Sequence, residues 1–316
     1  MIVIVTVAQD LHALSVQERV RAHGHECHVL EADRVAQRPC LSYGIGHDVA
    51  DGALTSEDLR IGLADAEVLW LRTIRSTQIL AQPIEDEHAV AIVNNDSRGA
   101  LLGMLVTQFR GRWVSSLEAT ARGSDKLVQL AAAHATGLRV PRTLVSQSRG
   151  EILAFDAACG GRTIVKSVVG APGPMLETKV LDVGRFGEAD FAVAPAIYQE
   201  YVDGSDHLRL ACFGDRSFAA RIRTDDLDWR TNLDVSITPY DVEHSLHAKV
   251  RSVLDALGLE MGIVDLKLTA EGEPVWLEVN PQGQFLFLDA FTDLRLADRC
   301  AEFLVSAAAA PSASAA

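Results

Sequence analysis

The stretch from residue 262 to residue 289 constrains the fold most, because apolar and polar residues alternate in it twice, on either side of the turn-forming segment TAEGEP. A period of two places successive residues on opposite faces of a strand, so this stretch is predicted to form a β-hairpin with one apolar face. The residues expected on the apolar face are Val264, Leu266, Leu268, Val275, Leu277 and Val279. The residues expected on the polar face are Asp265, Lys267, Trp276, Glu278 and Asn280.

The polar face of this hairpin would bring two carboxylates and one amide oxygen together, from Asp265, Glu278 and Asn280. Such an all-oxygen set suits a hard divalent cation such as Mg²⁺, which keeps its other coordination positions for water and substrate phosphates. A polar face that is merely solvated fits the alternation equally well. It gives no reason, however, for Trp276 and the apolar run 285–288 to flank the carboxylates.

Composition excludes several classes of protein. The 316 residues are 48% hydrophobic and 23% charged, which is typical of a globular protein with two or three compact lobes. A net charge of −14 disfavours binding to nucleic acid or to an anionic membrane, because either would need a basic surface. The five scattered cysteines predict free thiols in a reducing cytoplasm. No apolar segment approaches the ~20 residues that span a bilayer, and the N-terminal apolar run is interpreted as a strand.

The apolar periodicity predicts a mixed α/β chain. The expected strands are 2–7, 27–30, 68–71, 91–94, 142–146, 163–166, 178–180, 197–202, 208–213 and 217–223. The expected helices are 11–22, one that Ser124 can cap, 151–159, one within 239–257, and 293–307. Residues 37–54 are expected to be a loop. The predicted parts are a small α/β domain (1–122), a central part (123–196), a C-terminal part (197–306) and a disordered tail (307–316).

Two lysines are placed to neutralise a polyphosphate. Lys166 ends a strand directly before the small-residue loop VVGAPGPM, and Lys126 begins a helix 40 residues earlier. A loop that offers backbone N–H groups between two lysines can bind phosphates, although no Walker A pattern occurs and either lysine alone is also typical of a solvated surface.

A second candidate site follows in the chain. Gln199, Glu200, Tyr201 and Val202 join two predicted elements, so their backbone groups could contact an adenine edge. Asp206, four residues further on, could accept hydrogen bonds from ribose hydroxyls.

Three arginines are expected on the polar face of the next hairpin. Arg209 alternates with apolar residues in one strand, and Arg221 and Arg223 do so in the other. A cluster of such cations can hold a transferring phosphoryl group or an acyl phosphate, although a solvated face is the alternative for at least one of them.

The order of these features resembles the ATP-grasp fold over roughly residues 126–289, preceded by the small α/β pre-ATP-grasp domain of that superfamily. The resemblance implies ATP and Mg²⁺ as cofactors. The residues implied to bind ATP are Lys126 and Lys166 at the phosphates, Gln199, Glu200, Tyr201 and Val202 at the adenine, Asp206 at the ribose, and Asn280. The residues implied to hold Mg²⁺ are Asp265, Glu278 and Asn280.

Two branches of the superfamily fit the sequence. Ribosomal-protein glutamate ligases are similar in the motif DWRTNL (228–233) and in the spacing of Asp206 and Arg209. The graspetide (microviridin-type) peptide macrocyclases look closer, because they share a WLRTIR-like strand, FAARI before DWR, and LEVNPQGQF followed by an apolar run. The short VVGAPGPM loop departs from the pattern and leaves the phosphate lid undefined.

The resemblance implies a cytoplasmic ATP-dependent ligase that crosslinks a ribosomally made precursor peptide through an acyl phosphate. Arg209, with Arg223 or Arg221, would hold that acyl phosphate, while the catalytic base is not evident, with Asp206 and Asp289 as weak candidates. The implied partner is a peptide with a leader and with acidic and Lys, Ser or Thr core residues. Homodimers are common in the resembled family. The alternatives are a ligase that adds amino acids to a protein tail, or a catalytically silent nucleotide- or leader-binding protein.

Overall fold

The computed structural model of the protein describes residues 1–37, 41–46, 53–56, 59–74, 77–170, 177–231 and 234–310. The chain divides into two compact units, each of which is described by itself. The first unit comprises residues 1–116, 284–286 and 295–316, and the second comprises residues 117–283 and 287–294. None of the described helices is both long enough and apolar enough to cross a membrane.

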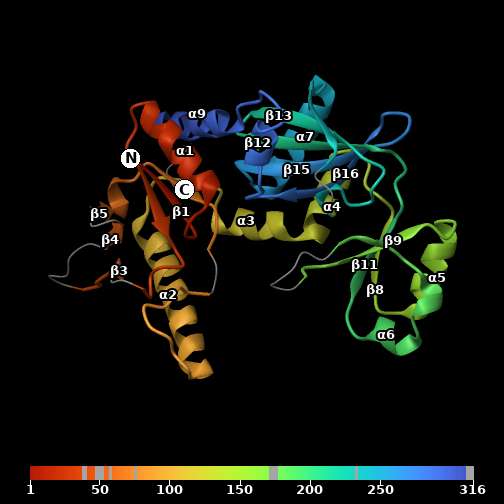
Figure 1. Ribbon diagram of the computed structural model, residues 1–316, viewed down its shortest axis with the longest axis horizontal. Coiled ribbons are helices and arrows are strands. Elements are labelled where there is room, and N and C mark those ends of the chain that lie inside the picture. Colours follow the sequence, from red (N-terminus) through yellow and green to blue (C-terminus); the bar gives the residue numbers. More distant parts are fainter. Residues whose placement is uncertain are drawn as a thin grey trace. The chain divides into compact units, whose positions relative to one another are not determined.

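The first unit, to which β1, α1, α2 and α9 in Figure 1 belong, contains a four-stranded parallel sheet in the order β2-β1-β6-β7. The strands of this sheet are β1 (Ile2–Thr6), β2 (Cys27–Glu31), β6 (Val68–Leu71) and β7 (Arg112–Val114). Its long helices are α1 (Leu11–Ala22), α2 (Glu87–Gln108) and α9 (Leu296–Ala309), and α1 packs against α9. β1 is buried along its whole length, as expected for a parallel sheet covered on both faces.

The region between β2 and β6 differs in part from the loop that the sequence predicted. It contains a small antiparallel sheet of β3 (Leu41–Ser42), β4 (Ala53–Ser56) and β5 (Leu59–Gly62), followed by the 3₁₀ turn Leu63–Asp65. Cys40 lies outside the described residues.

The strand predicted at 91–94 is wrong, because these residues lie within α2. A short apolar run such as Ala91 to Val93 cannot be assigned to a strand or a helix by periodicity alone. The side chain of Asp86 accepts a hydrogen bond from the backbone N–H of His88 at 2.9 Å, and this cap starts the helix ahead of the run.

The second unit begins with α3 (Leu117–Ser124) and α4 (Lys126–Ala135). The cap of α4 is Asp125 rather than the predicted Ser124, because the Asp125 carboxylate accepts from the N–H groups of Leu127 and Val128. The Ser124 hydroxyl instead donates to the carbonyl of Thr120 within α3.

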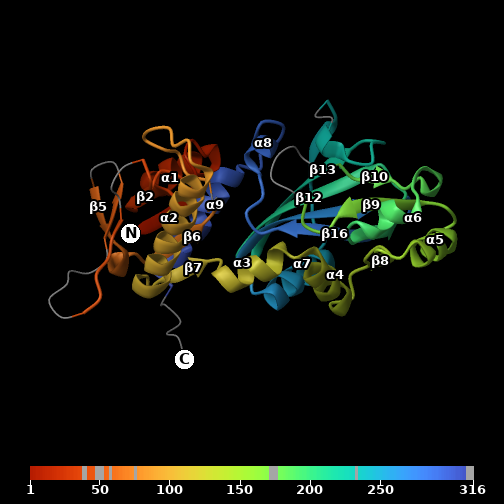
Figure 2. The same cartoon turned by 90° about the horizontal axis from the view of Figure 1, so that it is seen from below.

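A four-stranded antiparallel sheet, the lid sheet, follows in the order β10-β9-β11-β8. Figure 1 labels β8, β9 and β11 of this sheet, and Figure 2 labels β8, β9 and β10. Its strands are β8 (Thr143–Ser146), β9 (Thr163–Ser167), β10 (Lys179–Val180) and β11 (Ala196–Glu200). The helices α5 (Arg149–Ala158) and α6 (Glu188–Ala192) bury Ile152 and Phe191 against Tyr198 of this sheet, with the 3₁₀ turn Val183–Arg185 between β10 and α6. The tip of the VVGAPGPM loop lies outside the described residues.

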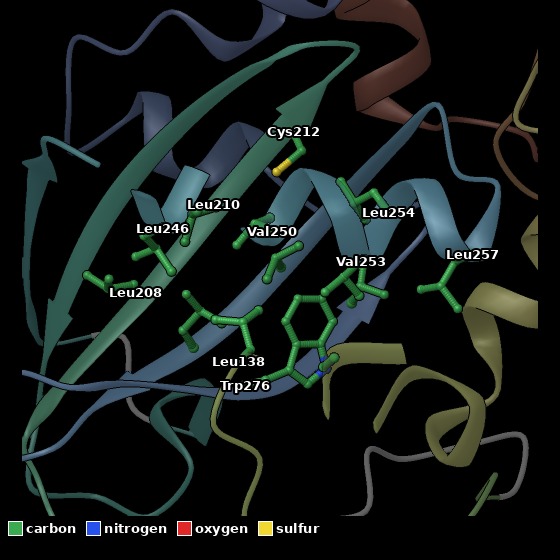
Figure 3. Packing of buried hydrophobic residues seen from close by; sticks show 14 of the residues in the cluster. Leu138, Leu208, Leu210, Cys212, Leu246, Val250, Val253, Leu254, Leu257 and Trp276 are labelled. Carbon is green, nitrogen blue, oxygen red and sulfur yellow. The ribbon is translucent and has the colours of Figure 1, made fainter. Parts of the chain in front are cut away.

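The larger sheet of the second unit is antiparallel, in the order β14-β13-β12-β15-β16. Its strands are β12 (Asp206–Phe213), β13 (Arg216–Arg223), β14 (Ser236–Tyr240), β15 (Met261–Leu268) and β16 (Pro274–Asn280). The helix α7 (His244–Leu257) packs its apolar stripe onto one face, where Leu246, Val250 and Leu254 meet Leu208 and Leu210 (Figure 3). The helix stops at Gly258, whose φ of 75° suits a left-handed cap. The 3₁₀ turn Trp229–Thr231 precedes β14, and the short helix α8 (Leu286–Asp289) follows β16.

The pairing of β15 with β16 contains a bulge that changes which side chains share a face. Asp265 opposes Glu278, but Leu266 opposes Trp276, so Leu277 is an extra residue on β16. Trp276 therefore lies in the core beside α7 (Figure 3), and Leu277 faces the opposite, polar side. The predicted faces of Val275, Trp276 and Leu277 are wrong, because a strict period of two has no place for an inserted residue, and Val275 opposes Lys267 on the cleft side.

The register of β12 with β13 separates the three arginines. Arg209 opposes Ala220, whereas Arg221 opposes Leu208 and Arg223 opposes Asp206. Directly opposed residues share a face, so Arg221 and Arg223 lie on the side of Leu208 and Arg209 lies on the other side. The prediction that all three arginines gather on one face is wrong. Both faces of this sheet carry apolar side chains, so an apolar residue does not mark the same face in each strand.

Candidate functional site

A cleft in the second unit is lined by residues of the lid sheet, of the larger sheet and of the segment 227–230. It lies on the face of the larger sheet that is opposite α7, because Asp265 and Glu278 line it while Leu266 and Val279 are in the core. This face is therefore the polar side of the hairpin at residues 262–289.

A row of charged side chains crosses three strands on the cleft side of the larger sheet, and Asp265 and Glu278 of this row line the cleft. Arg209 opposes Asp265, and Asp265 opposes Glu278. We call these three residues the carboxylate row. Nη1 of Arg209 donates to both carboxylate oxygens of Asp265 at 2.8 Å, and the guanidinium also lies over the rings of Trp229 and Phe287. Burial raises the pKa of Asp265, and the adjacent Arg209 opposes that shift.

Arg230 brings a second guanidinium to the same end of the cleft. It forms a forked pair with Asp228 at 2.7 and 2.6 Å, and its Nη1 lies 4.0 Å from Oε1 of Glu278. The hydrogen bonds to Asp228 raise the pKa of Arg230. In the sequence, Asp228 and Arg230 belong to the DWRTNL motif, which indicated the family but no role for either residue. The D-x-R spacing was the available signal, while Asn232 and Leu233 lie outside the described residues.

Both predicted lysines line the cleft opposite the carboxylate row. Nζ of Lys126 donates to the backbone carbonyl of Ser167 at 2.9 Å. Burial lowers the pKa of Lys166 to about 8, with Glu278 acting to raise it and Lys126 and Arg230 acting to lower it. Lys166 therefore interacts electrostatically with both Glu278 and Lys126, although at least 112 residues separate each lysine from Glu278 in the chain.

The predicted linker lines the cleft in part. Gln199, Glu200 and Val202 do so, and the buried Gln199 donates to the hydroxyl of Thr143 at 2.9 Å. Tyr201 is not among the described lining residues. Its ring instead lies beneath the guanidinium of Arg162, 4.5 Å away.

Five further predicted site residues are not among the described residues that line the cleft: Asp206, Arg209, Arg221, Arg223 and Asn280. Asp206 forms a forked pair with Arg223 at 2.7 and 3.0 Å on the α7 side of the sheet, and these hydrogen bonds hold its pKa below its usual range. Asn280 is exposed, and its Oδ1 accepts from the backbone N–H of Gln282 at 3.0 Å.

The donor set fits a divalent cation that is shared with a ligand. Among the described residues, no group of three or more His, Cys, Asp or Glu side chains is arranged to hold a metal by itself. Asp265 and Glu278 offer an opposed pair of carboxylates whose charge is now balanced by Arg209 and Arg230. Mg²⁺ takes one or two protein carboxylates and completes its shell with water and phosphate, so this pair suits it.

Comparison with known proteins identifies the fold. No family model matches the sequence, and no curated protein matches it. The macrocyclase MdnC of Microcystis aeruginosa MRC, solved with its precursor peptide MdnA, is similar with a TM-score of 0.86, over 96% of this chain and 99% of that one at 20% identity.

Two further solved structures are similar over nearly the whole chain. A RiPP-associated ATP-grasp ligase of Chryseobacterium gregarium, in complex with ADP and a leader and core peptide, has a TM-score of 0.85 at 21% identity, covering 98% of this chain and 97% of that one. The ATP-grasp ligase PsnB, complexed with minimal precursor, Mg and ADP, has a TM-score of 0.78 at 23% identity, covering 97% of both chains. The predicted ATP-grasp fold is confirmed.

Proposed function

We propose that the protein is an ATP-dependent ligase that forms side-chain amide or ester crosslinks in a ribosomally made precursor peptide. One observation carries the proposal: a single cleft places Lys126 and Lys166 opposite the carboxylates of Asp265 and Glu278, with a strand-end linker beside them. The similar solved structures, which include a macrocyclase and RiPP-associated ligases with precursor peptides, support this choice of substrate.

The two ends of the cleft suit the two ends of ATP. Lys126 and Lys166 would neutralise the phosphates, and the backbone of the linker from Gln199 to Val202 would contact the adenine. Asp265 and Glu278 would hold Mg²⁺, which would offset the negative charge of the phosphates.

The proposed reaction has two steps. A side-chain carboxylate of the peptide attacks the γ-phosphate of ATP, which gives an acyl phosphate and releases ADP. A lysine amine or a serine or threonine hydroxyl of the same peptide then attacks the acyl carbon and releases phosphate. Arg230, which lines the cleft, would stabilise the charge on the acyl phosphate, and Arg209 would do so from beside Asp265 on the same side of the sheet. Holding both reacting groups on one bound peptide would supply much of the rate. Arg221 and Arg223 have no part in this scheme, because they lie on the α7 side of the sheet.

The protein's thiols agree with a reducing compartment. The four described cysteines are free, and three of them, Cys27, Cys212 and Cys300, are buried. We therefore place the protein in the cytoplasm, where ATP and ribosomal peptides are both available.

The test of function is a mass measurement on the peptide encoded beside the gene. After incubation with the protein, ATP and Mg²⁺, its mass should fall by one water for each bond formed, with one ADP released per bond. A gain of one amino-acid residue would instead show the tail ligase. Release of ADP with no change in peptide mass would contradict both.

Nucleotide binding should weaken as the pH rises from 7 to 9. The pKa of Lys166 is about 8, so its ammonium is mostly charged at pH 7 and mostly neutral at pH 9. A phosphate group favours the charged form, so the affinity for ADP should fall about tenfold over this range. Calorimetric titration with ADP at pH 7, 8 and 9 measures this. Lys166→Arg should flatten the profile, because arginine stays protonated, and a flat profile in the natural protein would contradict the role.

A further inference from the structure

The strand that carries Glu278 is the last one of its sheet. In the order β14-β13-β12-β15-β16, β16 pairs with β15 on one edge and with none of the described strands on the other. Backbone N–H and C=O groups on such an edge must find other partners where they are buried. Val279, which directly follows Glu278, is only 3% exposed, so the groups that it presents on this edge need partners from the protein.

The side chain of Gln129 supplies those partners. Its Oε1 accepts a hydrogen bond from the backbone N–H of Val279 at 2.8 Å, and its Nε2 donates to the carbonyl of Val279 at 2.9 Å. Nε2 also donates to the carbonyl of Gly123 at 2.6 Å, so both N–H groups of the amide are used. Gln129 is 3% exposed, so water does not compete for these bonds. The amide thus bonds to the edge of β16 as the backbone of a neighbouring strand would.

Gln129 connects two parts of the site that lie far apart in the sequence. It is on α4, three residues after Lys126, so both side chains lie on the same side of that helix. It is not among the described residues that line the cleft. We propose that Gln129 is a positioning residue, which fixes the backbone at Val279 and thereby aims the neighbouring carboxylate of Glu278 at the divalent cation. The inference rests on the proposed ATP-dependent function.

The Glu278 carboxylate depends on its backbone for its position. Its side chain is 31% exposed, and the ion pair with Arg230 is long, at 4.0 Å, so this pair constrains it only loosely. Mg²⁺ requires near-ideal octahedral geometry, so a small displacement of one ligand weakens its binding. Loss of a residue that orients a metal ligand typically costs about 10-fold to 100-fold in metal affinity or activity.

The experiment measures how much Mg²⁺ strengthens the binding of ADP to the full chain. ADP is titrated calorimetrically in excess Mg²⁺ and again in EDTA, with the natural protein and with Gln129→Met. Methionine keeps the volume and the helix propensity of glutamine but cannot bond to Val279. The two proteins should bind ADP equally in EDTA, whereas the gain in affinity from Mg²⁺ should be about tenfold smaller in the variant. The Mg²⁺ concentration for half-maximal crosslinking should rise by the same factor, and excess Mg²⁺ should restore the rate.

Two controls separate positioning from folding. Gln147→Met removes another glutamine of the second unit, whose Nε2 donates to the carbonyl of Ala192 at 2.9 Å, and it should leave the effect of Mg²⁺ unchanged. Amide hydrogen exchange tests the contact in the natural protein, without any variant. The N–H of Val279 should exchange slowly there, because Gln129 covers it, and faster in Gln129→Met.

Each outcome decides a different claim. If Mg²⁺ strengthens ADP binding equally in the natural protein and in Gln129→Met, the positioning role is overturned and the ligase proposal stands. The same holds if the variant weakens ADP binding equally in EDTA and in Mg²⁺, or if the N–H of Val279 exchanges as fast as an exposed amide in the natural protein. If the natural protein does not bind ADP at all, both proposals are overturned.

Discussion

Replacing Glu278 with glutamine should slow ATP-dependent crosslinking by about a hundredfold to a thousandfold, the range typical for the loss of one group that stabilises transition-state charge. Glutamine keeps the shape of the side chain but removes its negative charge, which lies directly across the hairpin from Asp265. It also removes the carboxylate that acts to raise the pKa of Lys166, so Lys166 would hold its proton less firmly. The measurement is the single-turnover rate of peptide mass loss at several Mg²⁺ concentrations.

The matched control is Glu273→Gln. Glu273 lies just before the second strand of the same hairpin, is exposed, and accepts a hydrogen bond from Nη1 of Arg139 at 2.7 Å in a surface ion pair. The same substitution there should leave the rate close to that of the natural protein, because surface pairs contribute little. A Glu278→Gln protein that retains more than about a tenth of the natural rate would contradict the metal role of this carboxylate.

Replacing Arg209 with methionine should lower the free energy of unfolding by about 3–5 kcal/mol at neutral pH, because it leaves the buried carboxylate of Asp265 without its partner. The side chains of Arg209 and Asp265 are 8% and 12% exposed, so water cannot replace Arg209 as the partner of the Asp265 carboxylate. Methionine fills the volume of the arginine stem, which keeps the cavity term small. Adding Asp265→Asn should recover much of the loss, and urea unfolding of the single and double variants measures the coupling.

The pH dependence of this loss has a definite sign. Burial raises the pKa of Asp265, and removing Arg209 takes away the cation that opposes that shift. A carboxyl group whose pKa is higher in the folded state than in the unfolded state lowers stability as the pH rises through its folded pKa. The destabilisation by Arg209→Met should therefore be smaller at pH 5 than at pH 8.

Arg223→Met is the control for the buried pair. Arg223 also forms a forked pair with an aspartate, but its side chain is 59% exposed and lies on the other side of the sheet. Its replacement should change neither the free energy of unfolding nor the crosslinking rate appreciably. Equal losses of stability in the two variants would refute the difference between buried and exposed pairs on which the assignment of Arg209 depends.

Local patterns were sufficient for most of the elements. The predicted helix at 11–22 is confirmed at its bounds, and the strands at 68–71 and 208–213 lie where the alternation and the turn residues placed them. The position of Lys166 at the end of a strand was likewise predicted from the local sequence. These features depend on side chains within a few residues of one another, so their causes are present in the linear sequence.

The faces of the hairpin required more than its own residues. The alternation identified Asp265 and Glu278 as neighbours on one polar side, and they are directly opposed in the sheet. It could not show that Leu277 is inserted as a bulge, which turns Trp276 into the core beside α7 and Leu277 into the cleft. One extra residue reverses every face beyond it, and pairing with β15, rather than alternation in β16, determines where that residue is accommodated.

The amino-acid sequence alone thus specified the charged residues and most of the helices and strands. The order of these features also indicated the ATP-grasp superfamily. Strand register assigned the roles: it separated Arg209 from Arg221 and Arg223, paired Asp206 with Arg223, and brought Arg209, Asp265 and Glu278 together in the carboxylate row. The physical reason is that a contact between strands depends on pairing between segments that lie tens of residues apart. The free energy of that pairing comes from packing both faces of the whole sheet, so no single stretch of sequence contains it.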